Sequence, residues 1–219
     1  RHLEAQLDEL LPLYQKWGIK GIKFGFVTVG PQVCNKWLID AVEKCAEQEI
    51  LVDIHDNYRP SGLSRTYPNL LTQEGIRGNE HMPVASHNCT LPFTRFPQGA
   101  GDYTICYYSD RVKNTHAHQL AMSIIAYSPL QFVFWYDTPD KYEGEPEVEL
   151  FERLPTTWDE TRVLLGKIGE YVCVARRKSK DWFVGAITNE ESRTISFTLD
   201  FLDSKTTYSA KVFRDDPSV

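Results

Sequence analysis

Apolar residues recur at helical spacing from residue 3 to residue 14, where leucine and tyrosine side chains fall on one face. The pattern predicts an amphipathic helix that ends at Gly18, and Pro12 inside it indicates a kink or a break. Residues 19–27 form a short apolar run with lysines interspersed, which is typical of a strand. The chain therefore opens with a helix followed by a strand.

A second helical pattern covers about 32–48, and an apolar strand follows at 50–54. Helix, strand, helix and strand joined by short links indicate a parallel α/β sheet. In such sheets ligands bind beyond the carboxyl ends of the strands. Gly25 ends the first strand, and His55 and Asp56 end the second. We therefore expect both strand ends to face one cleft.

Proline and glycine punctuate the chain from 57 to about 115, which favours functional loops that contain short elements. The run 103–108 is either a strand or the lining of a loop. A helix is predicted at about 114–128, and 131–136 has the pattern of a buried strand that ends at Asp137.

After the polar stretch 138–147, the sequence pattern changes from alternating helices and strands to short apolar runs typical of β-strands. A short helix is predicted at about 148–153, and an antiparallel β module follows from about 158 to the end. Its expected strands cover 171–177, 182–187, 195–199 and 208–213. We accordingly divide the chain into residues 1–157 and 158–219.

Composition narrows the classes of function. A net charge of −6 does not favour nucleic acid or an acidic membrane as partner. No apolar run is long enough for a transmembrane span. The five cysteines are widely spread, without the spacing of a zinc site or a dense disulfide framework. The chain begins at Arg1 inside a predicted helix, so we expect a missing N-terminal part of the same polypeptide.

Three acids, Asp56, Glu74 and Glu80, follow the second strand within a turn-rich stretch. Glycoside hydrolysis needs two carboxylic groups, one protonated and one ionised. A cluster rich in oxygen also suits Ca²⁺, which takes six to eight oxygen ligands. Alternatively, Glu74 and Glu80 lie on a solvated surface, where most acids are found.

Basic side chains near the same strands are candidates for substrate binding. His55 could hydrogen-bond a sugar hydroxyl, orient a carboxylate or be structural. Lys23 lies on an otherwise buried strand and must reach a polar cavity or a partner. Arg59 and Arg65 could grip hydroxyl groups or pair with the local acids. Phosphate-loop, dinucleotide and serine-nucleophile motifs are absent from the sequence.

Five longer runs are distinctive: GIKGIKFGFVTVGPQ, VDIHDNYRPSGLSRTYPNLLTQEGIRGNE, TLPFTR, GAGD and SPLQFVFWYDTP. They strongly resemble glycoside hydrolase family 97, which holds Bacteroides-type α-glucosidases of starch-utilisation systems and related α-galactosidases. The resemblance implies an N-terminal β-sandwich, a (β/α)₈ TIM barrel and a C-terminal β module. The expected fold is thus α/β, with the second half of the barrel at 1–157 and an antiparallel β-sandwich at 158–219.

The resemblance also implies roles for individual residues. The second glutamate of the EGxxGxE motif, Glu80, is the expected general acid and contacts a calcium ion, for which Glu74 is a ligand. His55 is implied as a substrate contact. Asp56 is implied in base catalysis and in calcium coordination. The family usually has a glutamate at this last position, and Asp56 is one methylene shorter, which changes its reach.

Retaining members of the family carry an aspartate nucleophile at the position that aligns with Gly25. The resemblance therefore implies the inverting branch, which is associated with α-glucosidase activity on maltooligosaccharides. A second base carboxylate and at least one calcium ligand are expected outside this chain. The expected function is a calcium-dependent inverting exo-α-glucosidase, periplasmic or secreted in a bacterium. The alternatives are an α-galactosidase of the same family and a catalytically incomplete carbohydrate-binding fragment.

Overall fold

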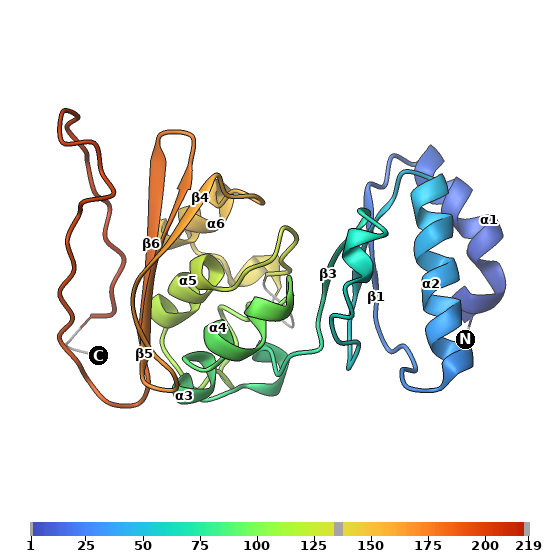
Figure 1. The fold of residues 1–219 in the computed structure, drawn as a ribbon, viewed down its shortest axis with the longest axis horizontal. Helices are drawn as coiled ribbons and strands as arrows, with labels where there is room; N and C mark the ends of the chain where they lie inside the picture. The colour runs from blue at the N-terminus through green and yellow to red at the C-terminus, as the bar shows by residue number, and fades with distance from the viewer. Residues whose placement is uncertain (1, 134–137, 217–219) are drawn as a thin grey trace.

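The structure is a computed structural model that describes residues 2–133 and 138–216 (Figure 1). Its first part alternates helices and strands, as the apolar pattern predicts. The elements are α1 (His2–Lys16), β1 (Gly21–Phe24), α2 (Gln32–Glu47), β2 (Leu51–Ile54) and β3 (Leu70–Gln73). Helix α1 continues through Pro12 to Lys16, so the break considered at this proline does not occur.

The three short strands form a parallel sheet in the order β1-β2-β3, which confirms the predicted parallel pairing. Helices α1 and α2 lie together on one side of this sheet (Figure 1). The core between sheet and helices is built from Leu7, Leu11, Phe24, Leu38, Val42, Val52, Ile54 and Leu70. Strand β3 was not predicted, because its four residues lie in a stretch dominated by turn residues.

The middle of the chain is built from loops and short helices. These are η1 (Leu63–Arg65), η2 (Asn79–His81), α3 (Ala85–Asn88), α4 (Leu91–Thr94), η3 (Phe96–Gln98), α5 (His116–Ile125), η4 (Pro139–Lys141), η5 (Pro146–Val148) and α6 (Glu149–Arg153), where η denotes a 3₁₀-helix. The run 103–108 lines a loop and makes a single parallel bridge, between Ile105 and Val133. The strand expected at 131–136 lies partly outside the described residues.

An antiparallel sheet follows, formed by β4 (Glu160–Lys167), β5 (Tyr171–Lys178) and β6 (Asp181–Thr188). Helix α5 packs against β6 at Gly185, where a Cβ atom would lie 2.8 Å from the carbonyl oxygen of Ala121. The strands predicted at 171–177 and 182–187 are confirmed, whereas β4 was not predicted.

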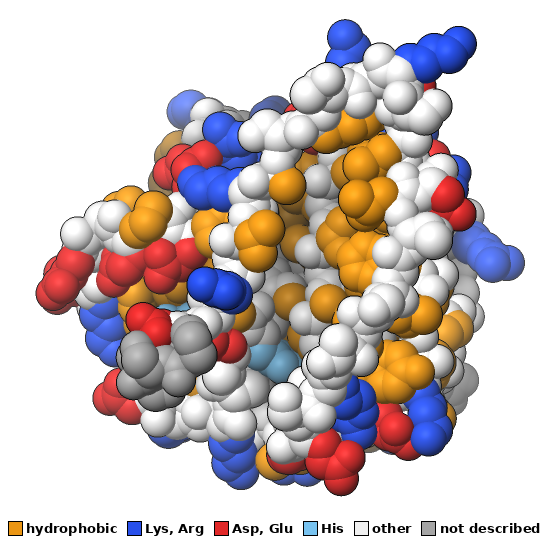
Figure 2. Space-filling model, turned by 90° about the vertical axis from the view of Figure 1, so that its left-hand side faces the viewer, with side chains coloured by type: hydrophobic (Ala, Val, Ile, Leu, Met, Phe, Trp, Pro, Cys, Tyr) orange, Lys and Arg blue, Asp and Glu red, His pale blue; other side chains and the backbone are white. Residues whose placement is uncertain are grey.

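The last two expected strands, at 195–199 and 208–213, are wrong for the structure as described: neither range forms a ladder there. The chain after β6 runs alongside the sheet without pairing to it (Figure 1). Its alternating apolar side chains stay largely exposed, including Leu199 and Val212. Figure 2 shows hydrophobic side chains gathered along a hollow on this face. Alternation of apolar and polar residues is not sufficient for a strand, because a strand also needs backbone hydrogen bonds from a neighbouring strand.

Among the described helices, none combines the length and apolar character needed to cross a bilayer.

Candidate active site

Strand β2 presents its side chains alternately to the helices and to the opposite side of the sheet. Val52 and Ile54 pack into the core under α1 and α2. Asp53 and His55, two residues apart, therefore share the other side. Lys23 on β1 is in register with Asp53, which brings a lysine, an acid and a histidine together at the strand ends.

His55 is buried and lies within ion-pair distance of four carboxylates. Its Nε2 is 2.6 Å from Oδ2 of Asp102 and 3.2 Å from Oδ2 of Asp53. Its Nδ1 is 3.4 Å from Oε2 of Glu74 and 3.8 Å from Oε1 of Glu80. We call these five residues the acidic cluster.

The acids control the protonation of the imidazole. Burial lowers the pKa of His55, but the hydrogen bonds to Asp102 and Asp53 raise it more, and the result is a pKa of about 9. His55 is therefore an imidazolium at neutral pH and carries a proton on both nitrogens. This charge offsets part of the repulsion among the surrounding carboxylates.

Glu74 follows β3 and is buried beside the imidazolium. Burial raises its pKa to about 7; the charge of His55 opposes this shift, and the charge of Glu80 adds to it. The backbone N–H of Glu74 donates to the carbonyl oxygen of Ile54 at 2.8 Å, which fixes the exit of β3 against the end of β2. Glu74 can therefore exchange a proton near neutral pH.

Lys23 reaches the cluster from β1. Its Nζ lies 3.8 Å from Oε1 of Glu80 and 3.9 Å from Oδ2 of Asp102. The same Nζ is 4.5 Å from the centroid of the Phe132 ring, which is the geometry of a cation–π contact. The expectation that Lys23 reaches a polar site is confirmed by these contacts; its role toward a substrate stays a prediction.

Asp56 ties the strand ends together rather than joining the cluster. Its φ of 65° is unusual for a residue with a side chain, and its Oδ2 accepts the N–H of Val27 at 2.8 Å. Its carbonyl oxygen accepts the N–H of Gly75 at 3.0 Å. The ends of β1 and β2 thus meet at one edge, as expected from Gly25, His55 and Asp56, and the end of β3 joins them there.

Within the described part of the chain, two groups of residues bring possible ligand atoms within 4.8 Å of one another: His55 with Glu74 and Glu80, and His55 with Asp53 and Asp102. Oε1 of Glu80 is buried and accepts no hydrogen bond from the described residues. A carboxylate oxygen in this state fits an oxygen-preferring cation such as Ca²⁺. An imidazolium has no lone pair to offer, so Glu74 and Glu80 are the groups that suit the ion.

The predicted site residues do not all converge. Of the expected calcium ligands, Glu74 and Glu80 come together, while the carboxylate of Asp56 turns toward Val27 and lies outside both groups. Arg65 is exposed at the end of η1, and none of the contacts of the acidic cluster involves it. Asp102 was not predicted as a site residue; its signal in the sequence is the GAGD run, an acid among glycines.

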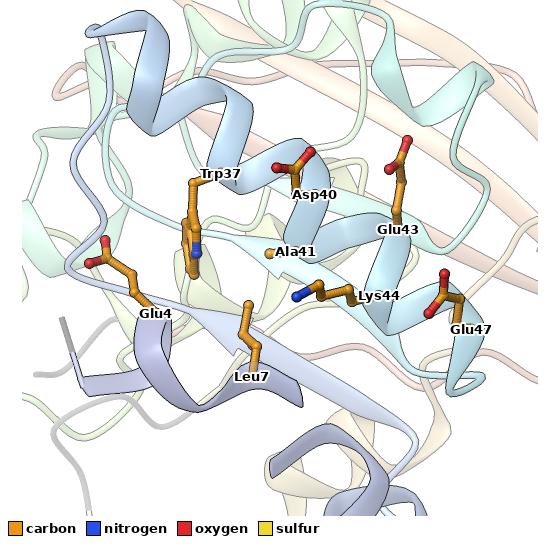
Figure 3. Close-up of a pocket in the computed structure, with 8 residues that line it drawn as sticks. All are labelled: Glu4, Leu7, Trp37, Asp40, Ala41, Glu43, Lys44 and Glu47. Carbon is orange, nitrogen blue, oxygen red and sulfur yellow. The ribbon is translucent and has the colours of Figure 1, made fainter. Parts of the chain in front are cut away.

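A separate pocket lies on the helix-covered side of the sheet. Figure 3 shows it between α1 and α2, lined by Glu4, Leu7, Trp37, Asp40, Ala41, Glu43, Lys44 and Glu47. It contains neither His55 nor any acid of the cluster. We assign no role to it.

Comparison with known proteins agrees with the fold. A family model described as glycoside hydrolase 97 matches residues 1–76, and one described as glycosyl-hydrolase 97 C-terminal, oligomerisation, matches residues 157–219. Together these two models of one family cover more than half of the chain.

Curated relatives match most of the chain. A retaining alpha-galactosidase of Bacteroides thetaiotaomicron is 36% identical over an alignment that covers 97% of this chain and 35% of that protein. A probable retaining alpha-galactosidase of Streptomyces bingchenggensis is 34% identical and covers 81% of this chain and 28% of that protein. The chain thus spans about a third of the length of these relatives.

Solved structures show the same fold. A glycoside hydrolase family 97 enzyme from Pseudoalteromonas, in complex with panose, has a TM-score of 0.82 and 28% identity and covers 92% of this chain and 37% of that chain. A family 97 enzyme from Pseudoalteromonas in complex with acarbose has a TM-score of 0.82 and 29% identity, with the same coverage of both chains. A beta-arabinopyranosidase gives 0.74 at 26% identity, covering 84% of this chain and 32% of that chain.

These likenesses and the acidic strand ends define the class as a barrel-type glycoside hydrolase: the second part of a (β/α)₈ barrel followed by a C-terminal β module. The chain belongs to glycoside hydrolase family 97. The exact division into residues 1–157 and 158–219 stays a prediction.

Proposed function

We propose that the protein is a calcium-dependent glycosidase that hydrolyses α-glucosides in oligosaccharides with inversion at the anomeric carbon. The observation that carries this proposal is Gly25 at the end of β1. A Cβ atom built there would meet nothing within 4 Å, and position 25 itself carries no carboxylate. An inverting enzyme needs space for a water molecule where a retaining enzyme has its nucleophile.

Glu80 is the proposed general acid, which gives its proton to the oxygen of the leaving group. The cations of Lys23 and His55 lie on the same side of this carboxylate. Both can stabilise the negative charge that remains on Glu80 after the proton has left. The same two side chains are the proposed contacts to sugar hydroxyl groups, and Arg65 is a further, more peripheral candidate.

Asp56 is the proposed partner in base catalysis, together with a carboxylate from outside this chain. The hydrogen bond from Val27 N–H to Oδ2 holds its side chain against the end of β1. That position is beside Gly25, where the attacking water has room. Proton transfer from this water to a carboxylate is the second half of the inverting reaction.

Glu74 and Glu80 are the proposed holders of a calcium ion, and Asp56 would join them only after its carboxylate turns from Val27. A bound calcium ion supplies positive charge that lets closely spaced carboxylates coexist. Glu74 and Glu80 are otherwise kept together by the imidazolium of His55.

A retaining α-galactosidase is the second candidate, because both curated relatives carry that name. The missing carboxylate at position 25 favours the first candidate, since retention requires a nucleophile. The two complexes from Pseudoalteromonas contain panose and acarbose rather than a galactoside.

NMR of the sugar first released from maltotriose by the full-length protein tests the proposal. We expect the β-anomer of a glucose-containing product at the earliest time point. Initial release of the α-anomer would overturn inversion, and cleavage of p-nitrophenyl α-galactoside in preference to the α-glucoside would favour the second candidate. Calcium dependence is tested by loss of turnover after chelation and its recovery on adding Ca²⁺.

The proposed location, periplasmic or secreted in a bacterium, rests on the family resemblance. Fractionation of the source cells tests it, and recovery of the protein in the cytoplasmic fraction would contradict it.

A further inference from the structure

Arg95 is buried directly after α4 and donates hydrogen bonds to five backbone carbonyl oxygens. Nε donates to Gly75 at 3.2 Å, and Nη1 donates to Gly99 at 2.8 Å. Nη2 lies within hydrogen-bond distance of Gln73, Glu74 and Ala100, at 2.9, 2.9 and 3.0 Å. All three nitrogen atoms of the guanidinium thus donate to backbone carbonyl oxygens.

These carbonyl groups belong to two separate segments of the chain. Residues 73–75 form the exit of β3 and include Glu74 of the acidic cluster. Residues 99–100 begin the turn that carries Asp102, the closest carboxylate to His55. A Cβ atom at Gly101 would lie 3.1 Å from Nη2 of Arg95, so a glycine gives the turn its close approach to the guanidinium.

No ion pair between Arg95 and an acid is found in the part of the chain that the structure describes. Its charge is directed instead at carbonyl dipoles of the two segments. Burial lowers the pKa of Arg95 to about 10, and the group remains charged at neutral pH. A planar fork of five N–H donors can hold two segments at a fixed distance, whereas the single ammonium of a lysine cannot.

We propose that Arg95 is a positioning residue that sets the separation of Glu74 and Asp102 on opposite sides of His55. Glu74 faces Nδ1 and Asp102 faces Nε2, and both lie in or next to the segments that Arg95 joins. Loss of the hydrogen bonds from Arg95 to the two segments would let either carboxylate move away from the imidazole. The consequence for calcium binding rests on the function proposed above; the effect on the geometry of His55 does not.

Arg176 offers a matched control. It is also buried, and burial also lowers its pKa to about 10. Its Nη2 donates to the carbonyl oxygen of Ile125, and its guanidinium lies near the rings of Tyr127 and Trp158. None of these contacts involves the acidic cluster. Replacing Arg176 therefore measures the effect of losing a buried guanidinium elsewhere in the fold.

The experiment compares Arg95→Lys and Arg176→Lys in the full-length protein. The first readout is proton NMR of the His55 ring N–H that faces Asp102, measured without Ca²⁺ or substrate. We expect this resonance to shift or to vanish through exchange in Arg95→Lys and to stay unchanged in Arg176→Lys. An unchanged resonance in folded Arg95→Lys would overturn the proposal.

Calcium affinity and kinetics form the second readout. Calorimetry should show Ca²⁺ binding weakened by about tenfold in Arg95→Lys, with kcat falling more than KM rises. Arg176→Lys should lower the thermal midpoint without either change. A wild-type protein that neither binds Ca²⁺ nor cleaves glycosides would refute the proposed function, while the NMR comparison would still decide the role of Arg95.

Gly101→Ala covers the case in which Arg95→Lys does not fold. The added methyl group contacts the guanidinium and displaces it while leaving all five donors in place. We expect the His55 resonance to shift in this variant as well, with Ca²⁺ bound several-fold more weakly. If Gly101→Ala kept the wild-type His55 resonance and the wild-type Ca²⁺ affinity, the positioning role of Arg95 would be contradicted.

Discussion

Nε2 of His55 and Oδ2 of Asp102 lie 2.6 Å apart, although 47 positions separate the two residues in the chain. Asp102 is fully buried and also accepts the backbone N–H groups of Thr104 and Phe132, at 3.1 and 3.0 Å. The Thr104 hydroxyl donates to Oδ2 as well, at 3.2 Å, so four donors among the described residues hold this carboxylate in one orientation. The imidazole that it binds is in turn the centre around which the other acids gather.

Asp102→Asn should lower the pKa of His55 from about 9, because the substitution removes the negative charge closest to the ring. NMR titration of the imidazole in the full-length protein measures this pKa directly. Asp53→Asn, at the longer distance of 3.2 Å, should have a smaller effect. A titration curve of His55 that does not move in Asp102→Asn would show that another group holds the proton.

The same pair makes stability depend on pH. Since the pKa of His55 is higher in the folded chain than its ordinary 6.5, its contribution is complete below pH 6.5 and is lost as the pH rises to about 9. The loss amounts to about 3 kcal/mol at 1.36 kcal/mol per pKa unit. Denaturant unfolding at pH 6.5 and pH 9 should show this decrease in wild type and a smaller one in Asp102→Asn.

Glu80→Gln should lower kcat on maltooligosaccharides by roughly 10²- to 10⁴-fold, because the amide cannot protonate the leaving oxygen. KM should change little, since the side chain keeps its size. The defect should be much smaller for an aryl glycoside whose leaving group needs no proton. Glu47→Gln, on the exposed side of α2, serves as the control. Equal losses on both substrate types would contradict the role of Glu80 as general acid.

Gly25→Asp should fold and change the stereochemistry of the product. The position has open space and an ordinary φ, so Gly25→Ala should alter the free energy of unfolding by less than about 0.5 kcal/mol. An aspartate there places a carboxylate where retaining enzymes have their nucleophile. We expect the β-anomer released by wild type to be replaced by the α-anomer or by loss of turnover. Continued release of the β-anomer at the wild-type rate would mean that position 25 does not face the anomeric carbon.

The parallel pairing and the strand-end location of the site followed from sequence, because both are local properties of apolar runs and the residues after them. Residues 50–54 and His55 with Asp56 are the clearest case. Asp102 could not be placed this way, since its partner lies 47 positions away and only the tertiary fold brings them together. The orientation of Asp56 was equally hidden, because it depends on the backbone N–H of Val27.

Near the C-terminus, the sequence pattern predicted strands that the structure does not form. The runs 195–199 and 208–213 have apolar alternation, yet no ladder forms in them within the described residues. Strand β4, with less regular alternation, is paired along its length to β5. Periodicity indicates which side of a strand can be buried; the neighbouring chain decides whether the strand exists.

His118 should make the protein less stable in mild acid. Tyr103 donates its hydroxyl hydrogen to Oδ1 of Asn88 at 2.9 Å, which turns the Asn88 amide N–H toward Nε2 of His118 at 3.0 Å. Nε2 must then be unprotonated. Burial lowers the pKa of His118 to about 4, although Asp215 and Glu190 act in the opposite direction.

The unfolded chain binds a proton at this histidine below pH 6.5, and the folded chain does so only near pH 4. The free energy of unfolding should therefore fall by about 3 kcal/mol from this group as the pH drops through that range. His118→Gln keeps an acceptor for Asn88 and should flatten this dependence. Identical slopes for wild type and His118→Gln between pH 4 and 6.5 would contradict a neutral buried His118.

Gly78→Ala should disturb the proposed general acid, Glu80, without replacing it. Gly78 has a φ of −77°, which any residue can adopt, but its Cβ would lie 2.5 Å from the carbonyl oxygen of Tyr103. That oxygen accepts the N–H of Asn79 at 2.9 Å, and Glu80 is the next residue. An added methyl group must push Tyr103 away, weaken this hydrogen bond and shift η2. Overpacking of this kind costs about 1–3 kcal/mol.

Comparison with Gly25→Ala separates this effect from the general cost of replacing a glycine, because the Cβ at position 25 has open space. We expect Gly78→Ala to lower the thermal midpoint and to reduce kcat on maltooligosaccharides, while Gly25→Ala leaves the midpoint unchanged. Equal midpoints for the two variants, with wild-type kcat in Gly78→Ala, would show that the contact with Tyr103 does not fix the position of Glu80. Close packing against the backbone of Tyr103 would then not explain why a glycine occupies position 78.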